Sequence, residues 1–369
     1  MQFCLPLIHA HPMELRMRIL VTGATGYIGS RAVPALLDAG HDVRAAFTSP
    51  DKAPTFWWST HPRVEVQEFD VFDADSVRAA VAGVDGVLYL IHSMDGDDFA
   101  EKDDQAASTM AEEGAAAGVS KFVYVSGIVP DVDESELSEH ITSRLSVERT
   151  LADSGVPTIT LRAAVIMGSA STSFEIIRQI SERLPVHAVP EWMDSTVQPI
   201  AVTDVTAAIV GAFAHDGPSH AYDVGGPTAL PYADLLQTYC EVAGIKRSQV
   251  SLPGVSSDVV GVLAGSITDV DSATVEALID SLHHDMVVAD DDFVEDLLPG
   301  GHELVDLEES IRRSLAAPDL EADPANRDPL GPMPYDPDWA GSSHGGLDTA
   351  KAAVKAVASS IAQRLPSSS

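Results

Sequence analysis

Short apolar runs alternate with amphipathic stretches from Arg18 to about Ala163. Apolar runs rich in β-branched and aromatic residues predict strands, whereas apolar residues that repeat every three or four positions predict helices. The predicted strands are RILVT, DVRAAF, VEVQEF, GVLYLI, KFVYVS and TITLR, and the predicted helices cover residues 28–39, 75–81, 99–117 and 137–153. Strands that alternate with helices are typical of parallel sheets, so the pattern predicts an α/β fold built on a doubly wound parallel sheet.

The pattern becomes less regular after these elements. It predicts a helix over residues 174–183, a short strand at VQPIAV, a helix over 204–213 and a strand at HAYDVG. We expect these pieces at the carboxyl edge of the sheet, where they would cover the ligand crevice. Helical patterns follow in YADLLQTYCEVAG, SATVEALIDSLHHD and LEESIRRSL, and they predict a small C-terminal helical cap region rather than an independent domain.

Charge restricts the partners of this chain. Acidic residues outnumber basic ones 56 to 22, which gives a formal net charge of -34. Such a surface repels nucleic acid and anionic membranes, so we expect neither as a partner. Acidic clusters such as DGDDFAEKDD and DDDFVED are spread along the chain, which favours a halophilic surface adapted to a salt-rich cytoplasm. An ordinary acidic protein is the alternative interpretation.

The cysteines and the apolar runs bear on location. Cys4 and Cys240 are too few and too far apart for a disulfide scaffold or a metal-binding Cys pair, so we predict no metal site and a reducing, cytoplasmic location. No apolar run approaches the roughly 18 residues that a membrane span requires. Residues 1–16 lack the basic segment and the long apolar core of a signal peptide, and we expect a loose N-terminal extension there.

A glycine-rich turn joins the first predicted strand to the first predicted helix. Gly23, Gly26 and Gly29 form a GxxGxxG pattern directly after RILVT. Residues without a side chain let the backbone approach a pyrophosphate, and a helix N-terminus offers free amides and a positive dipole. The turn therefore predicts a bound dinucleotide; a tight turn without a ligand is the alternative.

Residues after the second and third strands predict how the adenosine half would be held. Thr48 and Ser49 stand at the tip of the second strand with Lys52 close behind, and Asp51 is displaced into the turn. A hydroxyl or basic group in this place favours NADP over NAD, although the two hydroxyls are also common at the start of a turn.

The end of the third strand supplies the predicted adenine contacts. Asp70 and Val71 follow it in EFDVFDADSV, where they would hydrogen-bond and cover an adenine. Asp73 or Asp75 is the expected cap of the next helix, which leaves Asp70 free for the ligand.

Several strings together resemble the short-chain dehydrogenase/reductase superfamily. VTGATGYIG, EFDVFDAD, VLYLIHSM and KFVYVSG are similar to its atypical branch of NmrA-like and complex-I-39-kDa-subunit-like proteins, over Arg18 to about Gly225. The resemblance implies that NAD(P) binds to a Rossmann domain. It assigns the pyrophosphate turn to Gly23, Thr25, Gly26, Tyr27, Ile28 and Gly29, the adenosine ribose or its phosphate to Thr48, the adenine to Asp70 and Val71, and the nicotinamide side to Leu90, Ile91 and His92.

The resemblance and the composition together divide the chain into four parts. We predict an N-terminal extension over 1–16, an NAD(P)-binding domain with part of the substrate lid over 17–225, the cap region over 226–316, and a flexible acidic tail over 317–369. The last part includes a short helix predicted at LDTAKAAVKAVASSIAQRL.

The catalytic residues of this superfamily are only partly matched. Its catalytic members use a Ser at the end of the fifth strand, and a Tyr and a Lys four residues apart on the next helix. Ser126 is present in VSG, but the helix reads SEHITSR and places His140 and Arg144 at the four-residue spacing. An imidazole titrates near neutrality and an adjacent guanidinium lowers its pKa, so His140 is a candidate replacement for the Tyr.

Each of these residues also has a structural interpretation. Arg144 could hold a phosphate or carboxylate, or it could form a surface ion pair with Glu148, and His140 could be a helix-surface residue. His92 is a second candidate for chemistry. Arg162, near the end of the sixth strand, could meet a substrate anion or form a structural ion pair.

The sequence leaves two classes of function open. One is an NAD(P)-dependent enzyme, either an oxidoreductase acting on a small carbonyl compound or a sugar-nucleotide epimerase-like enzyme that uses transient hydride transfer. The other is a non-catalytic NAD(P)H-binding sensor, or a protein associated with a respiratory complex or its assembly. The missing Tyr favours the second class and the intact glycine turn is compatible with both. The partner is accordingly a small-molecule substrate or another protein.

Overall fold

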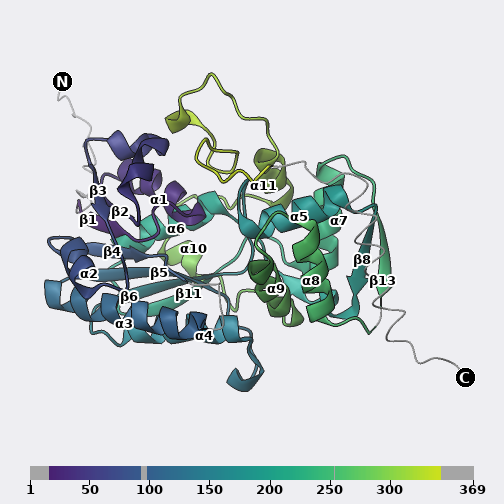
Figure 1. Ribbon diagram of the computed structural model, residues 1–369, viewed down its shortest axis with the longest axis horizontal. Coiled ribbons are helices and arrows are strands. Elements are labelled where there is room, and N and C mark those ends of the chain that lie inside the picture. The colour runs from purple at the N-terminus through teal and green to yellow at the C-terminus, as the bar shows by residue number, and fades with distance from the viewer. Residues whose placement is uncertain (1–15, 93–97, 253, 342–369) are drawn as a thin grey trace, which may run out of the picture.

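A seven-stranded sheet forms the centre of the protein (Figure 1). The computed structural model describes residues 16–92, 98–252 and 254–341. The strand order is β11-β6-β5-β4-β1-β2-β3, and each neighbouring pair is parallel. The strands are β1 (Arg18–Val21), β2 (Asp42–Phe47), β3 (Val64–Glu68), β4 (Gly86–Tyr89), β5 (Lys121–Gly127), β6 (Thr158–Ala163) and β11 (His220–Val224). The predicted doubly wound parallel sheet is confirmed.

The strand order places a ligand crevice between β1 and β4. The chain proceeds from β1 outward to β3, then returns to β4 on the other side of β1 and continues to β6. Crossovers on the two sides of this switch point leave the sheet in opposite directions, so a crevice opens at the carboxyl ends of β1 and β4. The glycine turn follows β1 directly, which places it at this crevice.

Helices cover both faces of the sheet because alternate strand residues point to opposite sides. Ile19 and Val21 belong to the core under α1 (Tyr27–Asp38) and α6 (Val202–Ala214), whereas Leu20 belongs to the core on the other face. That second face is covered by α2 (Ala74–Val81), α3 (Phe99–Ala117) and α4 (Glu139–Ala152).

The expected position of residues 202–224 was wrong. These residues do not cover the crevice; α6 packs beside α1, and β11 pairs in parallel with β6 as a further strand of the central sheet. Val205, Ile209 and Phe213 repeat at four-residue spacing and are buried, so the apolar stripe of α6 is satisfied by the sheet. Pairing with β11 also covers an edge of β6 that would otherwise expose unpaired backbone groups.

The cap region lies beside the carboxyl edge of the sheet (Figure 1). The cap helices are α5 (Thr172–Arg183), α7 (Tyr232–Val242), α8 (Ser257–Ile267), α9 (Ser272–Asp280) and α11 (Leu307–Ser314), whereas α10 (Asp292–Asp296) packs against α6 and β11. The expected helices are present, and α8 and α10 were not predicted. Of the strands in the small sheets, only the one at VQPIAV was predicted, and the structure forms two short strands there. The small sheets pair β7 (Ile166–Met167) with β10 (Ile200–Ala201), β8 (Val186–Pro190) with β13 (Ser248–Leu252), and β9 (Thr196–Val197) with β12 (Leu230–Pro231).

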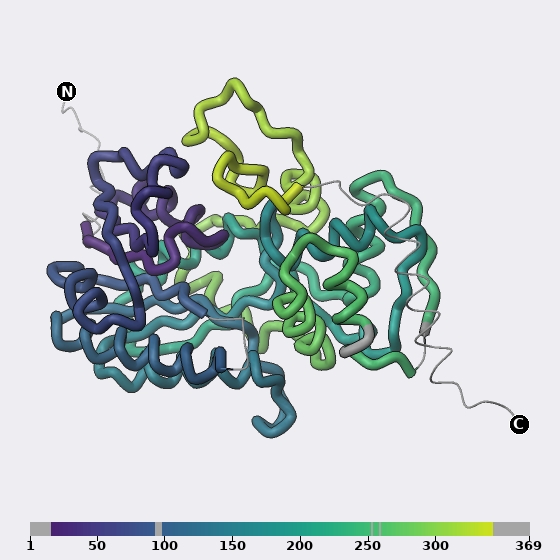
Figure 2. Tube along the Cα trace, in the orientation of Figure 1, coloured from purple at the N-terminus to yellow at the C-terminus, as the bar shows by residue number. Residues whose placement is uncertain are grey.

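The expected flexible tail is instead packed over residues 324–341, which we term the C-terminal strap. Leu330 is fully buried against the end of β10 and the start of α6, and Tyr335 stacks on Phe56 with ring centroids 5.0 Å apart. Asp336 forms an ion pair with Arg31 of α1. Figure 2 shows the strap, coloured yellow, beside the purple N-terminal part of the sheet domain. Apolar and charged contacts therefore hold a segment whose composition resembles that of a disordered tail.

Two sequence predictions fall on segments that the structure does not describe. The N-terminal extension lies outside the described residues except for Arg16, which forms an ion pair with Asp42. The short helix predicted at LDTAKAAVKAVASSIAQRL also lies outside them. Within the described part of the chain, no helix is both long enough and apolar enough to span a bilayer.

Candidate cofactor and substrate site

The glycine turn after β1 has a geometry that requires glycine. Gly23 has a φ of +66°, in the left-handed region, and its carbonyl accepts a hydrogen bond from the Gly26 amide at 2.9 Å. A Cβ atom on Gly29 would lie 2.2 Å from the Gly23 carbonyl oxygen, well inside the contact distance. The turn is therefore held tightly against the start of α1, which requires glycine at these positions.

The first turn of α1 is available to an anion. Gly26 is the N-cap residue, and no side chain caps the helix. The amides of Tyr27, Ile28 and Gly29 therefore begin the helix without a side-chain acceptor, and the helix dipole adds positive potential at the same place. The residues present thus fit the pyrophosphate of a dinucleotide.

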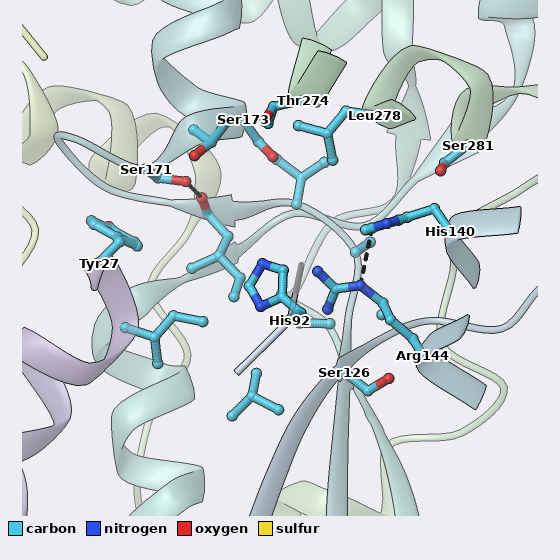
Figure 3. Close-up of a pocket in the computed structure, with 18 of the residues that line it drawn as sticks. Tyr27, His92, Ser126, His140, Arg144, Ser171, Ser173, Thr274, Leu278 and Ser281 are labelled. Carbon is cyan, nitrogen blue, oxygen red and sulfur yellow. Dashed lines mark hydrogen bonds between the residues drawn. The ribbon is translucent and has the colours of Figure 1, made fainter. Parts of the chain in front are cut away.

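A cavity of about 330 Å³ extends from this turn toward the cap region. Ten predicted site residues line it, from the glycine turn and from the carboxyl ends of β4 and β5 and the start of α4 (Figure 3). They are Gly23, Gly26, Tyr27, Ile28, Gly29, Leu90, His92, Ser126, His140 and Arg144. The structure therefore brings the predicted pyrophosphate turn and the three predicted catalytic residues to one cavity.

The remaining predicted residues do not line this cavity. Thr48 and Ser49 are exposed directly after β2, and Asp70 is exposed after β3. Because the strands are parallel, these positions share the sheet edge with the glycine turn, beyond the end of the cavity. The others outside the cavity lining are Thr25, Val71 and Ile91.

The local contacts of Asp70 and Val71 differ. The Asp70 carboxylate accepts a hydrogen bond from the Phe72 amide, and Asp73 caps α2, as the sequence predicted. Val71 is 7% exposed and packs in the core between the sheet and its helices. The backbone of Val71, and not its side chain, is therefore available for a contact with an adenine.

His140 and Arg144 form a direct pair on α4. Ser138 caps this helix, and the four-residue spacing places both side chains on one face. The Arg144 Nε donates a hydrogen bond to the His140 Nε2 at 3.0 Å. Because a guanidinium can only donate, Nε2 must be unprotonated and the His140 proton must lie on Nδ1.

The environment keeps the His140 ring neutral. Burial and the positive charge of Arg144, with a contribution from His92, lower the pKa of His140 from 6.5 to about 3. Figure 3 shows the Arg144 guanidinium between the two histidine rings. At neutral pH the pair therefore offers one fixed cation and one neutral imidazole with its N–H on Nδ1.

The proposed ion pair between Arg144 and Glu148 was wrong. Glu148 instead receives hydrogen bonds from Arg162, with Arg162 Nε 2.9 Å from Glu148 Oε2. Arg162 is thus part of a structural ion pair and does not line the cavity. Arg144 keeps its terminal nitrogens without a carboxylate partner among the described residues.

His92 and Ser126 complete the polar part of the cavity. Burial and the charge of Arg144 lower the pKa of His92. The His92 side chain is nevertheless accessible to solvent from the open cavity. Ser126 is 3% exposed, and its hydroxyl has no hydrogen-bond partner among the described residues. Burial raises the pKa of the nearby Tyr124 phenol, and Ser126 partly offsets this increase. The hydroxyls of Tyr124 and Ser126 nevertheless form no hydrogen bond of normal geometry.

The cap region contributes cavity residues that the sequence analysis missed. Thr274 and Leu278 lie on α9, Ser281 follows it, and Tyr232 begins α7. Residues 274, 278 and 281 are spaced by four and then three positions, which places them on one helix face. That spacing in SATVEALIDSLHHD was the available signal, but nothing local indicated which face meets the crevice.

A glycine turn at the switch point of a doubly wound sheet, opening on a polar cavity, defines a dinucleotide-binding protein. Residues 23–216, more than half of the 369-residue chain, match the family model described as NAD(P)H-binding. The chain belongs to this family, and within it to the atypical short-chain dehydrogenase/reductase type.

Relatives of this chain include reductases, dehydrogenases and a respiratory-complex subunit. The (4-alkanoyl-5-oxo-2,5-dihydrofuran-3-yl)methyl phosphate reductase of Streptomyces griseus is 31% identical over 61% of this chain and 74% of its own length. A 3 beta-hydroxysteroid dehydrogenase/isomerase of Mycobacterium tuberculosis is 35% identical over 30% of this chain, and the match spans only 31% of that enzyme. A mitochondrial NADH dehydrogenase subunit of Arabidopsis thaliana is 24% identical over 63% of this chain and 60% of its own length.

Solved structures share the fold at low sequence identity. The triphenylmethane reductase of Citrobacter, complexed with NADP(H), aligns with a TM-score of 0.62 at 21% identity, over 80% of this chain and all of that one. At this level of identity the likeness shows the Rossmann architecture alone.

Proposed function

We propose that the protein is an NADP(H)-dependent oxidoreductase that reduces a small carbonyl compound. The observation that carries the proposal is the hydrogen-bonded pair of His140 and Arg144, which lines the same cavity as the glycine turn. A sugar-nucleotide epimerase-like enzyme would use the same groups for a transient hydride transfer, so the two reactions differ in substrate rather than in machinery.

His140 would act as a hydrogen-bond donor to the substrate oxygen. When bound, the reduced nicotinamide supplies a hydride to the carbonyl carbon, and negative charge then develops on the carbonyl oxygen. The neutral imidazole offers its Nδ1 proton to that oxygen, because Nε2 is occupied by Arg144. A donor held in place before the reaction stabilises the charge without reorganisation.

The proton that completes the alcohol would come from solvent. Loss of the Nδ1 proton from a neutral imidazole leaves an imidazolate, and an arginine does not release its proton in proteins. The open cavity admits water to the same oxygen, and the unpartnered hydroxyl of Ser126 is a second donor. Arg144 is a positioning residue in this scheme, since it fixes the tautomer of His140.

The glycine turn and the sheet edge would hold the cofactor. The α1 amides would bind the pyrophosphate, and Leu90 and His92 would flank the nicotinamide. Thr48 and Ser49, exposed after β2 with Lys52 nearby, favour the extra phosphate of NADP.

Melting temperatures with NADPH, with NADH and without a nucleotide test the cofactor assignment. A ligand at 100 times its Kd stabilises a protein by about 2.7 kcal/mol, which is a readily measured shift. We expect the larger increase with NADPH. No increase with either nucleotide would contradict the assignment, and a larger increase with NADH would reverse the preference.

A second candidate is a non-catalytic NAD(P)H-binding protein that serves as a sensor or in a respiratory complex or its assembly. The similarity to the Arabidopsis thaliana NADH dehydrogenase subunit favours it, as does His140 in place of a Tyr. This candidate predicts nucleotide binding without NADPH oxidation across a broad set of carbonyl compounds. Turnover that is lost in His140→Ala with unchanged NADPH affinity would exclude it.

We also propose that the protein works in a salt-rich cytoplasm. The net charge of -34 supports this, because dense negative charge is tolerated where salt screens it. The buried free thiol of Cys240 is compatible with a reducing compartment.

A further inference from the structure

The cavity differs in charge from the rest of the molecule. The chain carries 56 acidic and 22 basic residues, yet no Asp or Glu lines the cavity within the described residues. Arg144 is the one residue of fixed charge in that lining, because the two histidines beside it are held neutral. The cavity therefore presents a single positive charge inside a strongly negative protein.

The positive charge of Arg144 has no carboxylate partner among the described residues. Its Nε donates to His140, and the neighbouring Glu148 is taken by Arg162. By contrast, Arg149 on the same helix forms an ion pair with Glu134. The Nη1 and Nη2 atoms of Arg144 thus have no acceptor among the described residues, and Figure 3 shows the guanidinium reaching between the histidine rings.

The cap end of the same cavity is largely apolar. The lining there includes Ile176 on α5, Leu278 and Ile279 on α9, and Leu282 and Met286 in the segment that follows. Hydroxyl groups interrupt this wall, from Ser171, Thr172 and Ser173 at the start of α5 and from Thr274 and Ser281. The cavity therefore joins an apolar wall to one unneutralised guanidinium.

We propose that the substrate is an apolar molecule that carries a single carboxylate, and that Arg144 binds this carboxylate through Nη1 and Nη2. The two terminal nitrogens present parallel N–H groups that match the two oxygens of a carboxylate. The inference rests on the carbonyl reduction proposed for this cavity, and it identifies the class of substrate.

Other substrate classes fit the cavity less well. A cation would be repelled by Arg144. A sugar nucleotide carries a diphosphate, which one guanidinium does not neutralise, and a cavity of about 330 Å³ must also hold the nicotinamide. The charge count thus favours a reductase of an apolar oxo acid over a sugar-nucleotide epimerase.

Isosteric probes that cannot be reduced test this inference separately from catalysis. The dissociation constants of 4-phenylbutanoate and 4-phenylbutanamide would be measured by calorimetry with the NADP⁺-saturated full-length protein, with UDP-glucose as a third probe. We expect the carboxylate to bind at least about tenfold more tightly than the amide, since charge-assisted hydrogen bonds are the stronger ones. UDP-glucose is expected not to bind.

Two variants locate the effect. Arg144→Gln is expected to remove the preference for the carboxylate and leave amide binding unchanged, whereas Arg144→Lys retains part of the preference. Arg149→Gln is the matched control on the exposed side of α4 and should behave as wild type. Melting temperatures of all variants would show that they are folded.

Several outcomes would overturn the inference. These are equal binding of acid and amide to the wild type, no binding of either, tighter binding of UDP-glucose, or a preference that survives Arg144→Gln. Loss of NADP⁺ affinity in Arg144→Gln would likewise assign this side chain to the cofactor. The wild-type comparison requires no variant, so it decides the question even if a variant fails to fold.

NADPH oxidation with 2-oxo-4-phenylbutanoate is measured separately, and its absence would count against the proposed reaction while leaving the binding result intact.

Discussion

Arg144 has two effects on the imidazole of His140. The Arg144 Nε fixes the proton of His140 on Nδ1, and burial together with the positive charge of Arg144 lowers the pKa of the imidazole to about 3. The imidazole is thereby kept neutral across the physiological range, as a donor rather than an acid. A Tyr at this position would exchange a proton with the substrate during the reaction. The role proposed for His140 is instead to keep its Nδ1 proton and donate a hydrogen bond.

The pH dependence of turnover tests that role. In the wild type we expect kcat/KM for carbonyl reduction to show no His140 titration between about pH 5 and 8, because the ring stays neutral there. In Arg144→Gln the pKa of His140 should rise part of the way toward 6.5, because burial still lowers it, and kcat/KM should then become pH-dependent at the acid end of this range. Initial rates with NADPH over this range measure it. An acid limb near pH 6.5 in the wild type would contradict the fixed tautomer.

The same pKa shift predicts how stability depends on pH. A folded-state pKa below the unfolded value means that the unfolded chain binds more protons, so this contribution is lost as the pH falls from 6.5 toward 3. Between pH 7 and 5, the free energy of unfolding should fall by up to about 2 kcal/mol more in the wild type than in His140→Gln. Denaturant unfolding at both pH values measures it. The same substitution at the exposed His220 is the control and should leave the wild-type difference unchanged.

Gly29 offers a test of the cofactor turn. In Gly29→Ala the added methyl would lie 2.2 Å from the Gly23 carbonyl oxygen, so the turn or α1 must shift. We expect destabilisation of about 1–3 kcal/mol, as for other overpacked sites, and loss of the NADPH-induced increase in melting temperature. Gly300→Ala is the control, because a Cβ there meets nothing within 4 Å. Normal NADPH stabilisation of Gly29→Ala would argue against this turn as the pyrophosphate site.

Among the secondary-structure elements, those specified by their own sequence were predicted more accurately than those that depend on contacts with distant residues. β2 and α3 were predicted at their observed bounds, since a short, mostly apolar run indicates a buried strand and a helix has its own period. α8 was not predicted, and its sequence, SDVVGVLAGSI, is apolar without a clear stripe. β11 was recognised as a strand but misplaced, because pairing partners are set by tertiary contacts that a single strand does not encode.

The C-terminal strap shows the limit of local prediction most clearly. Its composition is that of a disordered tail, and it is held by residues about 300 positions away in sequence, such as Arg31, at a separation of 305 from Asp336. No window of the sequence contains both partners. The site was predictable in part for the same reason: the glycine turn and the His140–Arg144 spacing are local, whereas the cap residues reach the cavity only through the fold.

The ion pair of the strap gives a prediction at this scale. The Arg31 and Asp336 side chains are 1% and 9% exposed, so Asp336→Asn leaves a buried guanidinium without its countercharge. Breaking one side of a buried pair costs about 3–5 kcal/mol. Glu134→Gln is the control, because its pair with Arg149 lies outside the strap, is well exposed and should contribute little to stability. Chemical denaturation of both variants measures the difference, and equal effects would show that the strap is not held through Arg31.

At the scale of the whole molecule, charge dominates. Few basic residues are available to neutralise a net charge of -34, and most arginines are already in ion pairs with one or two carboxylates. Excess negative charge on a compact surface destabilises it by self-repulsion, and salt screens that repulsion. We therefore expect the stability of the fold to depend on the salt concentration of its solvent as well as on its core.

The melting temperature at low and high salt concentration tests this expectation. Raising KCl from 0.1 M to 2 M should increase the melting temperature by several degrees, because the Debye length falls from about 10 Å to below about 3 Å. Sucrose at matched osmolality is the control for general exclusion effects and should give a smaller increase. A melting temperature that is unchanged or lower in 2 M KCl would contradict a halophilic surface.

The strap also sets an order of events during synthesis. Arg31 lies on the helix that follows the glycine turn, and its countercharge is at position 336 of 369. A ribosome must therefore have made at least 336 residues before this helix can acquire its final packing. Until then Arg31 lacks the Asp336 carboxylate and Phe56 lacks its stacking partner Tyr335, so we expect this face of the nucleotide-binding domain to complete its packing late although it is translated first.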